Sequence, residues 1–155
     1  AEATDEAELE RVADALALAL DEYARRWPPR TLALEEQAAV LRFRQAAEWG
    51  FGAGGAERLV CGHELTWTLA VEGRAALEPT CLHRCLRLQP IADLARLPEV
   101  LAPLRAWLEA CGLAAGEERT GGLAAALRAG GVQRVCGCGE MQSPDLSWKP
   151  GGMPR

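Results

Sequence analysis

Apolar side chains recur every three or four positions along the first 50 residues, a pattern that predicts two amphipathic helices. The first helix is expected over residues 5–26, with Asp5 and Glu8 as its capping pair. One face of this helix carries Leu9, Val12, Leu16, Leu20 and Tyr23. The Trp27-Pro-Pro sequence ends the helix, because the residue before a proline avoids helical geometry. The second helix is expected over residues 34–49.

The pattern changes after the glycines of residues 50–55, and an α/β region is expected over residues 59–136. Residues 65–71 are rich in β-branched and apolar residues and predict a strand, and further short strands are expected over 85–88 and 132–136. Helices are expected over 91–97, 98–111 and 120–129. In the second of these, Pro103 predicts a break and Gly112 a C-terminal cap. Residues 137–155, rich in glycine and proline, are predicted to be a loop-rich tail.

Two helices followed by strands that alternate with helices predict an α/β fold, in which helices flank a largely buried sheet. We interpret residues 1–155 as one partial domain of this kind. Apolar residues make up 49% of the chain and charged residues 25%, as in globular proteins. The net charge of −5, with dispersed basic residues, argues against a nucleic-acid partner. Since we see no membrane-spanning run and no signal-peptide pattern, we expect a cytoplasmic location.

Six cysteines raise the possibility of metal binding or of a reactive thiol. They are Cys61, Cys81, Cys85, Cys111, Cys136 and Cys138. Only Cys81 and Cys85 have a spacing typical of structural zinc, and side chains four apart on a strand diverge by roughly 13 Å. His83 and Arg84 lie between these two cysteines, which favours a reactive thiol, but we interpret all six as reduced, metal-free thiols. The glycines of residues 50–55 lack the Lys-Ser/Thr of a phosphate loop and are interpreted as a connection.

Two motifs resemble a known family. Residues 77–94 read L-E-P-T-C-L-H-R-C-L-R-L-Q-P-I-A-D-L, and residues 131–148 read G-V-Q-R-V-C-G-C-G-E-M-Q-S-P-D-L-S-W. Together they resemble the C-terminal region of LuxC-type acyl-CoA reductases, of the aldehyde dehydrogenase superfamily. The order of the two helices and of the Trp67 strand is also similar, so the resemblance covers most of the chain. It departs from the family pattern at Cys81 and Cys85, where Pro and Thr are usual, and at Glu140, where Arg is usual.

The resemblance implies that the chain is the C-terminal portion of an aldehyde-dehydrogenase-like catalytic domain. Such reductases convert a long-chain acyl-CoA thioester to an aldehyde with NADPH or NADH, through an acyl group held on a catalytic cysteine. The family's catalytic cysteine would lie upstream of Ala1, and none of the six cysteines matches it. The resemblance thus implies that the missing N-terminal part is a partner, that no catalytic residue lies in this chain, and that the chain is inactive alone.

One residue is a candidate cofactor contact. Glu78 falls where aldehyde dehydrogenases carry E-x-F-G-P, whose glutamate hydrogen-bonds the nicotinamide ribose, and an ionised carboxylate can accept both ribose hydroxyls. The alternative role of Glu78 is a solvated loop residue before Pro79. Two other functions stay open for the chain. It could be a noncatalytic α/β binding module that forms homo-oligomers through an exposed sheet edge, or a small zinc-binding module.

Overall fold

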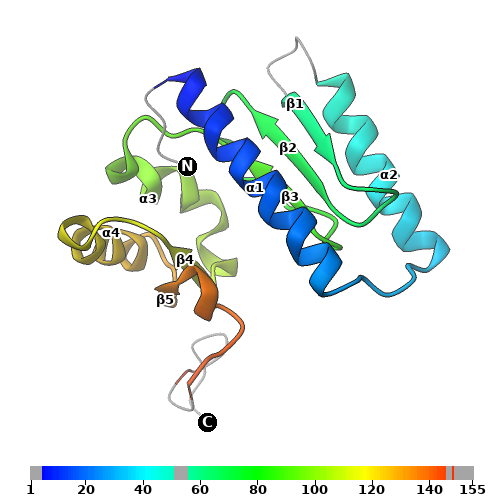
Figure 1. Cartoon of the computed structure of the whole chain (residues 1–155). Helices are drawn as coiled ribbons and strands as arrows, with labels where there is room; N and C mark the ends of the chain where they lie inside the picture. The colour runs from blue at the N-terminus through cyan, green and yellow to red at the C-terminus, as the bar shows by residue number, and fades with distance from the viewer. Residues whose placement is uncertain (1–4, 51–55, 146–147, 149–155) are drawn as a thin grey trace. The chain divides into compact units, whose positions relative to one another are not determined.

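The computed structural model describes residues 5–50, 56–145 and 148 (Figure 1). Its described part forms two compact units, Ala1–Ala92 and Asp93–Arg155. The first unit contains α1 (Glu6–Arg26), α2 (Leu34–Trp49), β1 (Ala56–Cys61), β2 (Thr68–Glu72) and β3 (Cys85–Leu88). The second contains η1 (Leu94–Arg96), α3 (Leu97–Leu101), η2 (Ala102–Trp107), β4 (Ala110–Leu113), α4 (Glu117–Ala129), β5 (Arg134–Gly137) and η3 (Cys138–Glu140). Both units combine helices with a small sheet, which confirms the predicted α/β class.

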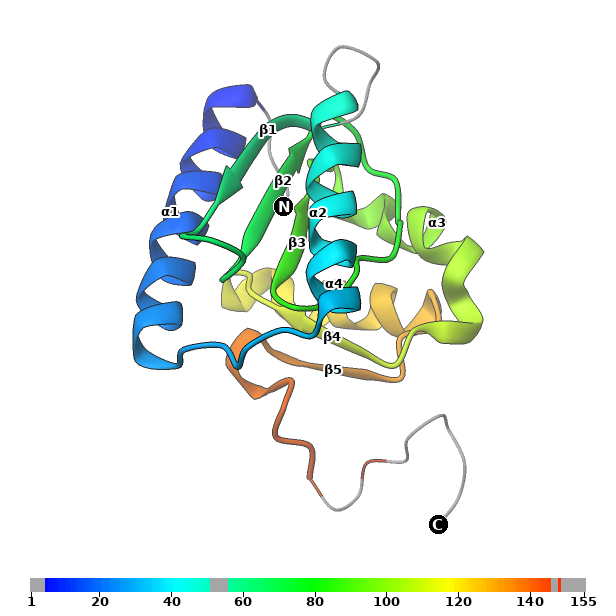
Figure 2. The same ribbon diagram turned by 90° about the vertical axis from the view of Figure 1, so that its right-hand side faces the viewer.

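The first unit is a three-layer sandwich of helix, sheet and helix. Its sheet has the order β1-β2-β3, with β2 antiparallel to β1 and parallel to β3. Figure 2 shows α1 and α2 on opposite sides of this sheet. Every residue of the central strand β2 is buried, as expected for a strand covered on both faces.

Alternate residues of β2 supply the two cores, because successive side chains of a strand point to opposite faces. Leu69 and Val71 pack with Leu9 and Ala13 of α1, whereas Ala70 packs with α2. Val12, Leu16 and Leu20 pack against the same core, so the predicted face of the first helix is confirmed except at Tyr23, which is 51% exposed. The helix also begins as expected, since the Asp5 carboxylate accepts a hydrogen bond from the Glu8 amide at 2.7 Å.

The second helix, α2, buries Val40 and Phe43 against the sheet. Its outer side is unusually apolar, because Leu34, Leu41 and Trp49 are 81%, 54% and 78% exposed. Leu41 therefore lies on the solvent side of α2, and a sequence pattern that counts apolar spacing alone does not distinguish the two sides.

Strand β1 was not predicted from the sequence. Its sequence, A-E-R-L-V-C, mixes charged with apolar residues and follows the glycines of residues 50–55, of which 51–55 lie outside the described residues. The strand is held by its pairing with β2 and by Arg58, whose guanidinium contacts Asp14 of α1 at 2.8 Å and also Glu10. Tertiary contacts thus stabilise a strand that its own composition does not favour.

The second unit places α4 against the two parallel strands β4 and β5, around a core of Leu101, Leu127 and Val132. The helix predicted over residues 98–111 is confirmed in its first turn and in its break near Pro103, but it is wrong beyond residue 107. Pro98 lies in the first turn of α3, the α-helix stops at Leu101, and residues 102–107 around Pro103 form a 3-10 helix. Residues 110–113 then form β4, so Gly112 is a strand residue and not a helix cap. Pairing with β5 outweighs the helical spacing of this segment.

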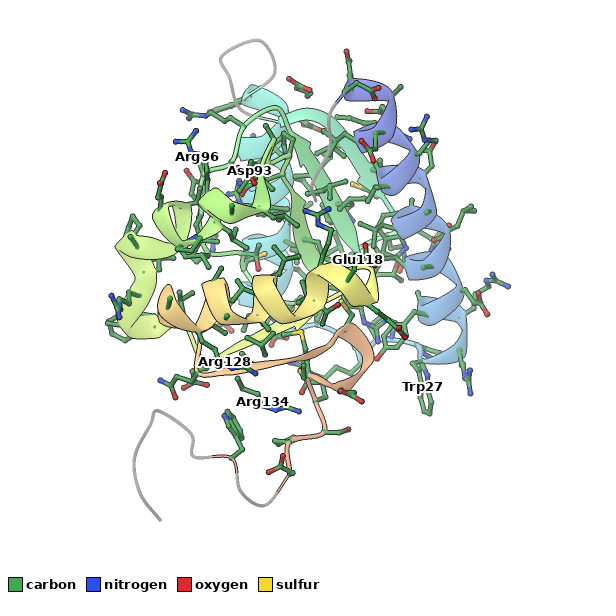
Figure 3. All side chains as sticks on the ribbon, turned by 90° about the vertical axis from the view of Figure 1, so that its left-hand side faces the viewer. Trp27, Asp93, Arg96, Glu118, Arg128 and Arg134 are labelled. Carbon is green, nitrogen blue, oxygen red and sulfur yellow. The ribbon has the colours of Figure 1, made fainter. Side chains whose placement is uncertain are left out.

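Beyond β5, Arg134 holds the described part of the tail through hydrogen bonds to its backbone. The Arg134 guanidinium donates hydrogen bonds to the carbonyls of Met141, Glu140 and Ser143 at 3.0, 2.9 and 3.2 Å. It also lies 6.0 Å from the centre of the Trp148 ring. Figure 3 shows Arg134 beside the chain that leaves β5. The loop-rich tail predicted from the sequence contains one short 3-10 turn, η3, in its described part.

Candidate functional site

Glu78 lies in the loop between β2 and β3, on the side of the sheet that faces α2. Its carboxylate oxygen Oε2 is 3.0 Å from a terminal nitrogen of Arg87, and its side chain is 58% exposed. For the other oxygen, Oε1, no hydrogen bond occurs within the described residues. The side chain therefore combines a fixed position with an accessible acceptor atom.

Arg87 links this exposed carboxylate to a buried one. Its second terminal nitrogen pairs with the carboxylate of Glu72, whose side chain is only 8% exposed. The guanidinium also lies 5.2 Å from the centre of the Phe43 ring of α2, a cation–π distance. Arg87 of β3 pairs in register with Ala70 of β2. Ala70 and Glu72 are two residues apart on β2 and share a face, so Arg87 lies on the same face of the sheet as Glu72.

Gln89 fixes the backbone of the loop that carries Glu78. Its amide nitrogen donates to the Ala76 carbonyl at 2.6 Å, and its amide oxygen accepts from the Ala76 amide at 3.3 Å. The same nitrogen donates to Glu72. Glu72, Arg87 and Gln89 thus form a connected polar network beneath the loop, and that network holds Glu78 at the end of β3.

A turn of left-handed backbone precedes β3. Leu82, His83 and Arg84 have φ angles of 66°, 52° and 59°, a conformation that non-glycine residues rarely adopt. Arg84 donates to the Trp27 carbonyl at 2.8 Å and lies 4.8 Å from the centre of the Tyr23 ring. His83 Nε2 is 3.7 Å from a carboxylate oxygen of Glu36. These contacts hold a turn that costs on the order of 1–3 kcal/mol per strained residue.

Cys81 and Cys85 lie at the two ends of this turn and are much closer together than strand geometry predicts. Cys81 packs against the core that contains Cys85, and its thiol donates a long hydrogen bond of 3.9 Å to the Leu82 carbonyl. Burial, reinforced by the neighbouring Cys81 thiol, raises the pKa of Cys85 to about 12. Desolvation also raises the pKa of Cys111 in the second unit. Both groups are therefore poor nucleophiles at neutral pH.

The expected separation of Cys81 and Cys85 by roughly 13 Å was wrong, because Cys81 lies before the turn and outside the strand. Within the described residues, no three cysteine, histidine or carboxylate side chains are arranged to hold a metal ion. His83 faces Glu36, and Arg84 faces Tyr23 and the Trp27 carbonyl.

A groove of about 450 Å³ opens in the first unit between the α1–α2 connection and the β1–β2 turn. Its lining residues are Pro29, Arg30, Thr31, Leu32, Gln37, Glu64, Leu65 and Thr66. The Arg30 guanidinium is bound to Glu36 at 2.5 and 2.8 Å, and this hydrogen bond lowers the pKa of Glu36 to about 2. The groove therefore offers no free positive charge from Arg30.

Sequence reasoning singled out Glu78 but missed Glu72, Arg87 and Gln89. The alternation of Arg87 and Gln89 with apolar Leu86 and Leu88 was a usable signal, since in extended backbone it places both polar residues on the same side of the chain. Their contact with Glu72 arises because β3 pairs with β2, and no local sequence pattern shows which strands pair.

Comparison with known proteins identifies the family. The family model described as Acyl-CoA reductase (LuxC) matches residues 1–153, which is nearly the whole chain. No curated protein matches the chain. In the described residues, no helix is long and apolar enough to cross a membrane. A match of this extent covers both units, and the chain therefore belongs to the LuxC acyl-CoA reductase family.

Proposed function

We propose that this chain forms the C-terminal part of the catalytic domain of an NADPH- or NADH-dependent reductase of long-chain acyl-CoA. The observation that supports this proposal best is the family match over residues 1–153. The fold agrees with it, because a helix-covered sheet whose central strand is wholly buried is a rigid support for a cofactor site.

Glu78 is the residue that we propose to contact the cofactor, through the ribose next to the nicotinamide. Its Oε1 atom is available to accept from a ribose hydroxyl, while Oε2 is bound to Arg87. One carboxylate oxygen of Glu78 would therefore accept a hydrogen bond from one hydroxyl of the ribose diol. When bound, the cofactor supplies the hydride, and Glu78 would orient the ring that carries it.

The isolated chain is expected to be inactive, because its two thiols with raised pKa are poor nucleophiles and none of its cysteines matches the family's catalytic position. We propose that the catalytic thiol belongs to the N-terminal part of the same enzyme. NAD(P)H oxidation with long-chain acyl-CoA tests this directly. Turnover by residues 1–155 alone, above the rate without protein, would refute it.

The role of Glu78 is tested in the full reductase that contains this segment. Glu78→Gln keeps the size of the side chain but removes its charge, so hydride transfer should slow more than acyl transfer to the enzyme. Rapid-quench measurements separate the two steps, since acyl-enzyme formation can be followed before the cofactor is added. Glu57→Gln is a matched control on β1. Equal slowing of both steps by Glu78→Gln, or of neither, would leave Glu78 as a loop residue.

A second candidate function is a noncatalytic module that self-associates. The exposed apolar residues Leu34, Leu41 and Trp49 of α2 favour it, because contiguous apolar surface often marks an interface. Light scattering at several protein concentrations tests this candidate. A monomer at all concentrations would argue against it, and Leu41→Glu should reduce any association that is seen.

A further inference from the structure

The thiols of Cys81 and Cys85 are brought together by an unusual piece of backbone. Leu82, His83 and Arg84 all have positive φ, so the chain makes one left-handed turn between the two cysteines. The turn is closed by a hydrogen bond of 3.0 Å from the Cys85 amide to the Leu82 carbonyl. A left-handed turn mirrors an α-helical one, in which four residues advance about 6 Å. That spacing lies within the roughly 4.4–6.8 Å between Cα atoms that a disulfide requires.

The surroundings of the pair are those of a preformed dithiol. Cys85 belongs to the core beneath α2, and Cys81 packs against that core. Cys85 is 5% exposed, whereas Cys81 is partly exposed and can meet a reagent from solution. Two adjacent residues anchor the turn: Arg84 donates a hydrogen bond to the Trp27 carbonyl, and His83 lies near Glu36. The two sulfurs are therefore held near each other before any reaction.

We propose that Cys81 and Cys85 form a redox-active dithiol that low-molecular-weight disulfides of the glutathione class oxidise to an intramolecular disulfide. The Cys81 thiolate attacks one sulfur of the reagent, the reagent's disulfide breaks, and one reagent thiol leaves with the proton that Cys81 has lost. Cys85 then loses its proton and attacks the Cys81 sulfur, which expels the second reagent thiol. The dithiol is oxidised, and one reagent disulfide is reduced to two thiols.

The two steps should differ in rate. The first uses the accessible thiol, whereas the second uses a thiol whose pKa burial raises to about 12. Closure is then slow near neutral pH and should accelerate about tenfold for each pH unit, because only the thiolate reacts. Cys81 lies three residues after Glu78 and Cys85 is the first residue of β3, so a disulfide between them would constrain the backbone next to the candidate cofactor residue. The proposal itself does not depend on the proposed reductase function.

The sequence offers a clean assay. The chain is equilibrated with graded ratios of reduced to oxidised glutathione, acid-quenched, alkylated and digested with trypsin. Arg84 lies between the two cysteines, so the disulfide would join peptide 75–84 to peptide 85–87 and be identified by mass. The same equilibration in concentrated urea gives the equilibrium constant for forming the 81–85 disulfide in an unfolded chain, which lacks the turn. Cys61, an exposed thiol on β1, serves as the internal control for simple glutathione adducts.

We expect the equilibrium constant for the 81–85 linkage to be at least about tenfold larger in the folded chain than in urea. Cys85→Ser should leave a stable glutathione adduct on Cys81. His83→Val should weaken the linkage more than His83→Gly, because a β-branched residue opposes positive φ. Equal constants in the folded and unfolded chain, or only separate glutathione adducts on Cys81 and Cys61, would overturn the proposal. Equal linkage in the two His83 variants would overturn the role of the turn.

Discussion

Arg87 binds two carboxylates whose environments differ sharply, and this asymmetry allows a quantitative prediction. Glu72 is 8% exposed and Glu78 is 58% exposed, yet both contact the same guanidinium. Removing one partner of a buried ion pair typically costs about 3–5 kcal/mol, because the remaining charge stays buried. An exposed pair contributes only about 0–1 kcal/mol. The effect of a substitution should therefore depend on which carboxylate loses its partner.

Arg87→Met should be the most damaging change, at about 3–5 kcal/mol, since it leaves the Glu72 carboxylate buried with Gln89 as its remaining partner. Glu72→Gln should cost less, because the Arg87 guanidinium keeps Glu78 and is itself 22% exposed. Glu78→Gln should cost about 0–1 kcal/mol. The double variant Glu72→Gln with Arg87→Met should recover part of the loss of Arg87→Met alone, because no buried charge remains.

Urea unfolding measures these differences, provided that the signal reports on the first unit. Hydrogen exchange of the β2 amides is suitable, because every residue of this strand is buried. Two results would refute this reasoning: equal losses of unfolding free energy for Glu72→Gln and Glu78→Gln, or a loss below about 1 kcal/mol for Arg87→Met. Either would show that the network contributes little to stability and that the burial of a carboxylate does not predict the strength of its ion pair.

Two further predictions follow from the first unit. Leu16→Asp should lower the free energy of unfolding by about 2–4 kcal/mol, because it places a charge against the α1 core. Leu18→Asp, at a residue 73% exposed, should change it by less than about 0.5 kcal/mol. Similar melting temperatures for the two variants would refute the assigned face. The Glu36 pKa is lowered from its ordinary 4.5 to about 2, mainly by its hydrogen bond with Arg30, so its contribution to stability is complete above pH 4.5 and is lost as pH falls toward 2. Acid titration of the wild-type chain and of Glu36→Gln checks this, since the variant should lose the corresponding part of the pH dependence.

The elements that the sequence predicted well are those with strong local signals. Helix α1 has an N-cap at Asp5, an apolar face and a Trp-Pro-Pro ending, and its bounds were predicted to within one residue. Helix α2 was predicted with its observed bounds. Strand β3 was also predicted with its observed bounds, 85–88.

The elements that failed depend on distant partners. Residues 110–113, A-C-G-L, have no β-branched residue, yet they form β4 because residues 134–137 pair with them in parallel. Strand β1 likewise needs β2 and the ion pair from Arg58 to Asp14. Short strands of this kind are stabilised by their neighbours more than by their own composition, so a local reading of the sequence misses them.

The candidate site follows the same division. Glu78 could be chosen from a motif, but its geometry depends on Arg87 of β3, which pairs with its carboxylate, and on Gln89, which binds the backbone of Ala76. The proximity of Cys81 and Cys85 could not be predicted, because three consecutive residues with side chains adopt positive φ without a glycine among them. Such a turn is stabilised by its anchors, and the sequence alone does not reveal those anchors.

The two motifs that resemble the family contribute to the molecule in different ways. In the second, Arg134 donates hydrogen bonds to the carbonyls of residues 140, 141 and 143. This arginine therefore has a structural role, which is to hold the chain that follows β5. In the first, the polar groups of Glu78 and the thiol of Cys81 remain accessible to a reagent. Chemistry in this chain is therefore to be sought in the first motif, although the second is the more recognisable. A substitution of Arg134 should affect the folding of the second unit, and a substitution of Glu78 should leave folding nearly unchanged, which is the contrast expected of a structural residue and a binding residue.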